Sequence, residues 1–253
     1  MRTATVSLLF FAGSALVRAD EVRDLVGRAD DAAAHDDFRQ ALDLYLTADR
    51  QWPDDPVILQ KIARQYSDLA DDRPTPSEKL HYVDEALTYS ERAVSLAPNN
   101  AVNVLSLAIC HGKMAAWGTV REKISYSRLV KEEADRALVL DPNYAWAHDV
   151  LGQWHCALAG VNAAERFFVR LFYGSLPAAS EAEGLAHLER AVELEPAEPA
   201  HHIELGLAYL AAKRSADARV ELTRGLALQG SRRFQVEEKT RARAALAALP
   251  QSS

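Results

Sequence analysis

The 253-residue sequence lacks the short motifs that mark common catalytic and nucleotide-binding sites. It contains no G-x-x-x-x-G-K-[ST] phosphate loop, no G-x-S-x-G nucleophile turn, no H-E-x-x-H zinc motif and no G-x-G-x-x-G dinucleotide motif. Its many carboxylates are expected on the solvent-facing sides of helices. We therefore expect a protein that is not an enzyme and that has no catalytic residue, no cofactor and no metal.

An excess of basic residues is also lacking, since 36 Asp and Glu outnumber 29 Lys and Arg and give a net charge of −7. Proteins that bind nucleic acid neutralise phosphates with clustered Lys and Arg, so this balance argues against such a partner. Beyond the N-terminus no segment is apolar enough to span a membrane, and we expect no transmembrane segment in the mature chain.

The first 19 residues form a separate segment. Arg2 precedes an apolar run over 4–17, and Val17 and Ala19 stand where a cleavage site needs small residues. This order predicts a secretory signal peptide over 1–19, cut after Ala19, and an exported protein that is periplasmic or secreted. A mitochondrial presequence is an alternative, but such peptides are amphipathic and this run is apolar all round. An uncleaved anchor is the other alternative.

A ten-residue phrase recurs along the rest of the chain, as RAVSLAPNNA (92–101), RALVLDPNYA (136–145) and RAVELEPAEP (190–199). Internal repetition of this kind indicates a solenoid, and each Pro marks the end of a helix. The phrase matches the tetratricopeptide repeat, a helix–turn–helix unit of about 34 residues. We predict an all-α, right-handed helical solenoid of about five helix pairs over 20–249. The repeats are expected to start at Val22, Pro56, Ala101, Ala145 and Pro199.

Small residues recur where the helices of each predicted pair cross. On the first helices these are Ala29, Ala63, Ala108, Gly152 and Gly206, and on the second helices Ala48, Ala93, Ala137, Ala191 and Gly225. Helices approach to about 8–10 Å only where the crossing side chains are short, so this pattern supports the repeat register. Repeats two, three and four are longer than the basic unit, and their extra residues lie between the two helices of each pair. Insertions on one edge of a solenoid often form a binding face.

The insertions bear a family resemblance. The segments that carry it are VREKI (120–124), LVKEEADRAL (129–138), LGQW (151–154), ERFFVRLFYGSLP (165–177) and HLERAVELEP (187–196). The chain resembles the regulator-of-microtubule-dynamics family, a divergent branch of the tetratricopeptide proteins. The resemblance implies an all-helical, non-catalytic module. Eukaryotic relatives are associated with microtubules and with organelle contact sites, including lipid handling there.

The third insertion holds the first set of candidate site residues. Phe168 and Phe172 share one face of a predicted helix over 165–173, and Arg166 and Arg170 form its polar stripe. One interpretation buries this helix as core on the concave side of the solenoid. A second makes it the roof of an apolar groove, with the two arginines at the rim, and a third inserts it into a bilayer surface.

The second insertion holds the other candidates. Its cations are Arg121, Lys123, Arg128 and Lys131. They are either a solvated helix face or the rim of a site for an anionic ligand.

Two Cys-His pairs fall at similar places on neighbouring first helices, at 110–111 and 155–156. Adjacent residues on a helix point about 100° apart, which makes a zinc site from all four unfavourable. We expect the two histidines to pack in the core. A disulfide between Cys110 and Cys156 stays an alternative.

These observations predict a scaffold that binds a protein or peptide partner through its concave face and insertions. The alternative is a carrier of an apolar or lipid ligand, held in a groove roofed by the helix over 165–173. A polar, open concave face would favour the first function, and a closed apolar tunnel would favour the second.

Overall fold

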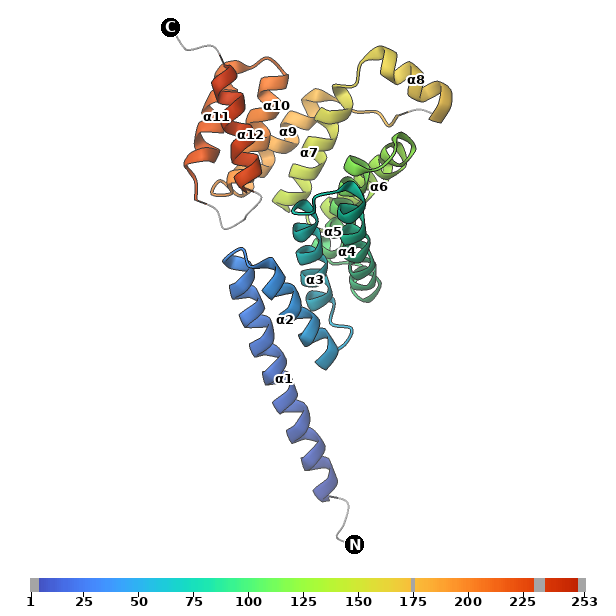
Figure 1. Cartoon of the computed structure of the whole chain (residues 1–253), viewed down its shortest axis with the longest axis vertical. Helices are drawn as coiled ribbons and strands as arrows, with labels where there is room; N and C mark the ends of the chain where they lie inside the picture. The colour runs from blue at the N-terminus through green and yellow to red at the C-terminus, as the bar shows by residue number, and fades with distance from the viewer. Residues whose placement is uncertain (1–4, 174–175, 230–234, 250–253) are drawn as a thin grey trace.

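The computed structural model describes residues 5–173, 176–229 and 235–249, with side chains given from Ala19 onward except at 172–173 and 235–237. In these described ranges the chain forms twelve helices and no strand (Figure 1). The helices are α1 (Thr5–Ala34), α2 (Phe38–Gln51), α3 (Pro56–Asp71), α4 (Pro76–Leu96), α5 (Ala101–Trp117), α6 (Val120–Leu140), α7 (Ala145–Ala159), α8 (Ala163–Tyr173), α9 (Glu181–Leu194), α10 (Pro199–Ala211), α11 (Ser215–Ala227) and α12 (Gln235–Ala248).

Five helix pairs follow one another along the chain: α1–α2, α3–α4, α5–α6, α7–α9 and α10–α11. Four of the first helices begin at the predicted repeat starts, Pro56, Ala101, Ala145 and Pro199. The predicted all-α solenoid of helix pairs is therefore confirmed. The first repeat differs, because α1 begins well before Val22 and runs without a break through Ala19. A cut after Ala19 stays a prediction, and residues 1–4 lie outside the described part of the chain.

The starts of α3 and α5 are encoded locally. The Asp55 carboxylate accepts hydrogen bonds from the backbone amides of Val57 and Ile58, at 2.8 and 3.2 Å, and Pro56 takes the first helical position. Asn100 caps α5 in the same way. A side-chain cap satisfies amides that the helix itself leaves unpaired, and Pro is favoured at the first position because it has no amide to lose.

The small residues at the helix crossings are buried as predicted. Ala63 and Ala108 have almost no exposed surface. Gly206 is constrained still further, since a Cβ atom there would lie 2.7 Å from Cγ of Leu222 in the paired helix α11. Large side chains around these contacts, such as Leu59 and Leu151, complete the packing between repeats.

The three insertions have different structures. The first two lengthen the second helices, so that α4 and α6 each have 21 residues. The third forms a separate helix, α8, which projects from the stack beyond the end of α7 (Figure 1). All three lie at the edge of the solenoid where the first helices end and the second helices begin.

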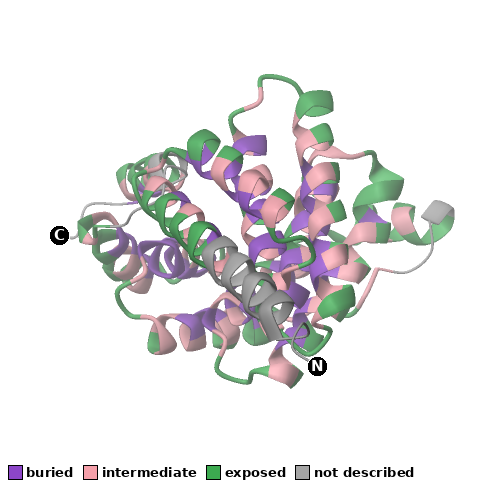
Figure 2. Ribbon diagram, turned by 90° about the horizontal axis from the view of Figure 1, so that it is seen from below, coloured by how far each residue is buried: buried purple, intermediate pink, exposed green. Residues whose placement is uncertain are grey.

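The solenoid has an inner and an outer layer of helices. Successive first helices contact each other, α3 with α5, α5 with α7 and α7 with α10. In the described part of the chain no comparable contact joins successive second helices. The first helices therefore form the inner, concave layer. Buried residues concentrate within the stack, and green exposed residues lie around it (Figure 2).

The helix α12 is an addition that the five predicted pairs do not include. It packs against α10 and α11, as the first helix of a sixth repeat would do. Its Ala242 is the eighth residue of the helix and fully buried, which is the place of the small residue in the other first helices. No helix in the described ranges is both long enough and apolar enough to cross a membrane.

Candidate binding site

The inner layer presents a row of side chains on the second and ninth residues of consecutive first helices. We call this row the inner face; it consists of Val57, Arg64, Val102, Ile109, Trp146 and Gln153. Residues seven positions apart lie on the same side of a helix, so each pair points in one direction. Val57, Val102 and Ile109 are exposed although they are apolar. An apolar row with polar neighbours on a concave surface is suited to contact with another chain.

Polar bonds tie the first helices together beside this row. The Gln60 amide donates a hydrogen bond to the Ser106 hydroxyl at 3.3 Å, which joins α3 to α5. Lys113 of α5 donates to the Asp71 carboxylate at 2.6 Å and to the Ser67 carbonyl at 2.7 Å. These bonds fix the spacing of α3 and α5, and they make this part of the concave side polar.

The helix α8 does not fill the core. Phe167 and Leu171 are 68% and 63% exposed, and Phe168 is exposed as well. The interpretation of this helix as core was therefore wrong. Its amphipathic pattern identified the apolar face correctly, but helical periodicity does not say which element covers a face. The side chain of Phe172 lies outside the described residues.

The two arginines of α8 have different surroundings. The Arg166 guanidinium donates hydrogen bonds to the carbonyls of Leu158 and Val161, and the second of these measures 3.0 Å. It thus bonds to carbonyls in the last turn of α7 and just after it, where a positive charge is also favoured by the helix dipole. Arg170 is exposed. The structure therefore gives Arg166 a capping role, while a ligand-binding role for Arg170 stays a prediction.

The four cations of α6 do not form a single patch. Lys131 is paired with Asp135 at 2.6 Å on its own helix, and its ammonium group lies 5.7 Å from the centre of the Trp154 ring. Arg121 and Arg128 are seven residues apart and share a side, whereas Lys123 points elsewhere around the helix. All except Lys131 are exposed. A role for these four cations at the rim of a site for an anionic ligand stays a prediction.

The cysteines and histidines of the first helices have structural partners. Cys110 and Cys156 are both free thiols, and burial raises the pKa of Cys110 to about 12. His111 bonds to the Glu133 carboxylate at 2.8 Å. His155 accepts a hydrogen bond from the Ser180 amide at 3.2 Å and so braces the start of α9, and burial lowers its pKa, which favours the neutral ring that can accept this bond. The histidines therefore pack as expected, and no disulfide joins the cysteines.

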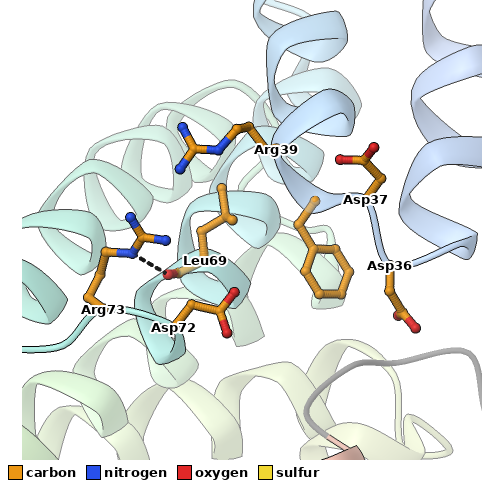
Figure 3. A pocket seen from close by; sticks show the side chains of 7 residues that line it. Asp36, Asp37, Arg39, Leu69, Asp72 and Arg73 are labelled. Carbon is orange, nitrogen blue, oxygen red and sulfur yellow. Dashed lines mark hydrogen bonds between the residues drawn. The ribbon is translucent and has the colours of Figure 1, made fainter.

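A polar depression of about 380 Å³ lies between the α1–α2 turn and the end of α3 (Figure 3). Its walls include Asp36, Asp37, Arg39 and Arg73. Asp37 already caps α2 through the Gln40 amide, and Arg73 donates to the Leu69 carbonyl at 3.2 Å. These side chains serve local structure, and we assign the depression no binding role.

Comparison with known proteins identifies the family. A sequence model described as regulator of microtubule dynamics protein 1-3 matches residues 25–249, which is nearly the whole solenoid. The chain belongs to this family. The resemblance of the insertion segments to the regulators of microtubule dynamics is thus confirmed.

Curated relatives agree with this assignment. Regulator of microtubule dynamics protein 2 of Bos taurus is 24% identical over 173 residues, covering 68% of this chain and 42% of the relative. The human protein 2 is 28% identical over 143 residues, covering 56% and 35%. Protein 1 of Bos taurus is 26% identical over 144 residues, covering 56% and 45%. The chain thus spans less than half the length of these relatives.

Solved structures support the fold. A thermophilic TPR protein of Thermus thermophilus superposes with a TM-score of 0.67 at 20% identity, covering 89% of this chain and 99% of that one. MamA of Desulfovibrio magneticus gives a TM-score of 0.50 at 16% identity, covering 83% and 95%. At such identities the likeness concerns the fold alone.

The family membership corrects the expected location. These relatives are mammalian proteins named as regulators of microtubules, which lie inside cells. The expectation of a periplasmic or secreted protein was therefore wrong. An apolar N-terminal run with one arginine is common to several targeting signals, so it did not specify a destination.

Reasoning from the sequence expected binding through the concave face and the insertions, but it named candidate residues on the insertions only and none of the inner face. A signal for it was present. On α3 and α5 the second and ninth residues lie outside the buried packing positions, yet Val57, Val102 and Ile109 are apolar there. Apolar residues outside the packing register of a repeat are candidates for partner contact.

Proposed function

We propose that this member of the family is a non-catalytic scaffold that binds a protein or peptide partner along the inner face. One observation carries the proposal: apolar Val57, Val102 and Ile109 are exposed in a row on the concave layer of a rigid helical stack. Solenoids commonly bind through such extended concave surfaces. The row crosses consecutive repeats, so an elongated segment of a partner would contact several repeats at once.

The chemistry of the inner face suits a peptide. Arg64 and the exposed Gln153 lie at the ends of the apolar row and offer hydrogen-bonding groups beside it. A partner helix or extended strand with apolar residues on one side and polar residues on the other would satisfy both kinds of group. Because the stack is already ordered, binding would cost little conformational entropy on this side of the interface.

The exposed face of α8 extends the proposed surface at the insertion edge. Phe167, Phe168 and Leu171 give this helix an apolar face that the solenoid leaves exposed. This arrangement favours partner contact over the lipid-carrier alternative, because a helix that projects from the stack does not roof a groove. The polar bonds from Gln60 and Lys113 likewise favour an open concave side over an apolar tunnel.

Non-catalytic action fits the internal pairing of two buried histidines, His111 and His202. His202 bonds to Glu221 at 2.6 Å, and His111 bonds to Glu133 at 2.8 Å. In each case the histidine braces two helices of one repeat. A general base would have to face a substrate within hydrogen-bonding reach.

The proposal can be tested by affinity capture from a eukaryotic cell extract with matched variants. Val102→Asp with Ile109→Asp places two charges on the inner face, and Val139→Asp places one on the outer helix α6, where Val139 is 82% exposed. The inner-face variant should lose proteins that the parent and the Val139→Asp control both retain. Equal recovery by all three folded proteins would contradict binding through the inner face.

A further inference from the structure

The last helix fills a socket between α10 and α11 with small side chains. Ala242, Ala245 and Leu246 of α12 pack against a cluster that includes Ile203 of α10 and Leu222 of α11. Two of the three described residues of α12 in this cluster are alanines, which bury little apolar area each, while Leu246 and the adjacent Leu249 also pack in a second cluster that includes Leu205. The cluster around Ile203 and Leu222 is thus contacted mainly by small side chains among the described residues of α12.

The charges beside the socket are imperfectly matched. Arg241 of α12 pairs with Glu204 of α10 at 3.2 Å. The neighbouring Glu238 of α12 instead buries a carboxylate oxygen that has no hydrogen-bond partner among the described residues. Burial, together with the nearby carboxylates of Glu204, Asp149 and Glu198, raises the pKa of Glu238 to about 7, and Arg241 opposes this rise.

The pKa of Glu204 is also raised to about 7, first by burial and then by Asp149, against the effect of Arg241. Acidic groups from three first-layer helices therefore meet at this end of the concave side: Asp149 from α7, Glu204 from α10 and Glu238 from α12. Of the two charged groups of α12 that lie near Glu204, Arg241 attracts its carboxylate and Glu238 repels it.

We propose that the α10–α11 socket is a docking site for a basic amphipathic helix of a partner, and that α12 occupies this site in the free protein. The proposal rests on the function proposed above and names the chemistry of the partner. Such a helix carries Lys or Arg where α12 has Glu238, keeps a basic residue three positions later, and carries a larger apolar residue in place of Ala245. It displaces α12 by pairing with Glu204 and Asp149 and by filling the socket more fully.

Two synthetic peptides provide the probe, both spanning residues 235–249 and both carrying a fluorescent label. One has the native sequence, and the other has Glu238→Lys. Each is titrated into the full-length chain by fluorescence anisotropy. The lysine peptide should bind at least about tenfold more tightly, a change that corresponds to about 1.4 kcal/mol. Hydrogen exchange should show that its binding increases exchange in α12 of the chain.

The pH dependence gives a second readout. Docked α12 favours a protonated Glu238, so its docking is strongest below pH 4.5 and weakens as pH rises toward about 7. The lysine peptide should therefore bind more tightly at pH 7.5 than at pH 5.5. The native peptide should show little change, because it shares this dependence with the helix that it displaces.

Two variants of the chain complete the test. Glu204→Gln is nearly isosteric, and it should remove most of the preference for the lysine peptide. Glu238→Lys within the chain should strengthen docking of α12 and weaken binding of both peptides. The proposal would be overturned if the lysine peptide did not bind, or if the Glu204→Gln chain kept the full preference of the parent chain for the lysine peptide. No cellular partner is used and no inner-face residue is changed, so this outcome is separate from the test of the proposed function.

Discussion

Gly152 of α7 and Leu188 of α9 meet so closely that a Cβ atom on the glycine would lie 2.5 Å from Cγ of the leucine. The same added Cβ atom would lie 2.9 Å from the carbonyl oxygen of Gly184. Gly152→Ala should therefore push α7 and α9 apart and reduce the free energy of unfolding by about 1–3 kcal/mol. Chemical denaturation measures this change.

Gly112→Ala on α5 is the matched control. A Cβ atom there would meet only Val130, at an ordinary 3.9 Å. Because alanine favours the helix over glycine by about 1 kcal/mol, this variant should be neutral or stabilised. If both variants showed the same stability as the parent, the helix crossing would not depend on the small residue.

Phe167 and Leu171 should contribute little to stability. They lie four residues apart on one side of α8, and both are more than half exposed. Changing both to Ser should shift the free energy of unfolding by no more than about 0.5 kcal/mol. Leu188→Ala provides the contrast, since this leucine is buried and its truncation should cost about 2–5 kcal/mol. A large loss in the α8 variant would restore the interpretation of this helix as core.

The two arginines of α8 should differ when each is replaced by Gln. Arg166→Gln removes the bonds to the Leu158 and Val161 carbonyls, so the end of α7 should exchange its amides faster. The expected loss of stability is about 0.5–1.5 kcal/mol. Arg170→Gln should leave stability and exchange unchanged, because Arg170 is exposed. Identical exchange in the two variants would contradict the capping role.

Acid should weaken the contact between α7 and α9. Burial lowers the pKa of His187 below 6.5, and the nearby His148 and His155 lower it further. The folded state thus binds this proton less readily than the unfolded state does. The stability that His187 contributes is fully present above pH 6.5 and is lost as pH falls below that value.

The variant His187→Gln isolates this effect from other titrating groups. It should lose less stability than the parent between pH 7.5 and pH 5. Thermal unfolding of both proteins across this range supplies the comparison. Parallel curves for the two proteins would mean that His187 does not titrate differently on unfolding.

Much of the fold was predictable because its signals are local. Proline and capping residues mark the helix starts, as Asp55 and Pro56 do for α3. Small residues such as Ala63 and Gly206 mark the crossings, where only short side chains fit. Both signals can be read from spacing alone, and they placed four of the five repeat starts.

The exposed position of α8 was not predictable in this way. Phe167 and Leu171 identify an apolar face, but whether another element covers that face depends on the path of the chain after Tyr173. The helix α12 was missed for a related reason, because the repeated phrase that marks the other helix pairs does not recur in it, and its Ala242 was the main match to the repeat.

Arg166 shows within the candidate site that a local sequence pattern does not identify the contacts made in the folded chain. Its sequence position on a polar stripe suggested a ligand contact, whereas its partners are the backbone carbonyls of Leu158 in α7 and of Val161 in the turn that follows. Only the three-dimensional course of the turn after α7 brings those carbonyls within reach. Its neighbour Arg170 has the same spacing pattern and is exposed instead.

Site-specific photocrosslinking tests the central claim most directly. A photoreactive phenylalanine analogue replaces Ile109, which is 36% exposed on the inner layer, or Val139, which is 82% exposed on the outer layer. After irradiation in a eukaryotic cell extract, position 109 should give discrete protein adducts that position 139 does not give, despite its greater exposure. Adducts of equal yield at both positions, or lipid adducts in place of protein at position 109, would contradict partner binding along the inner face.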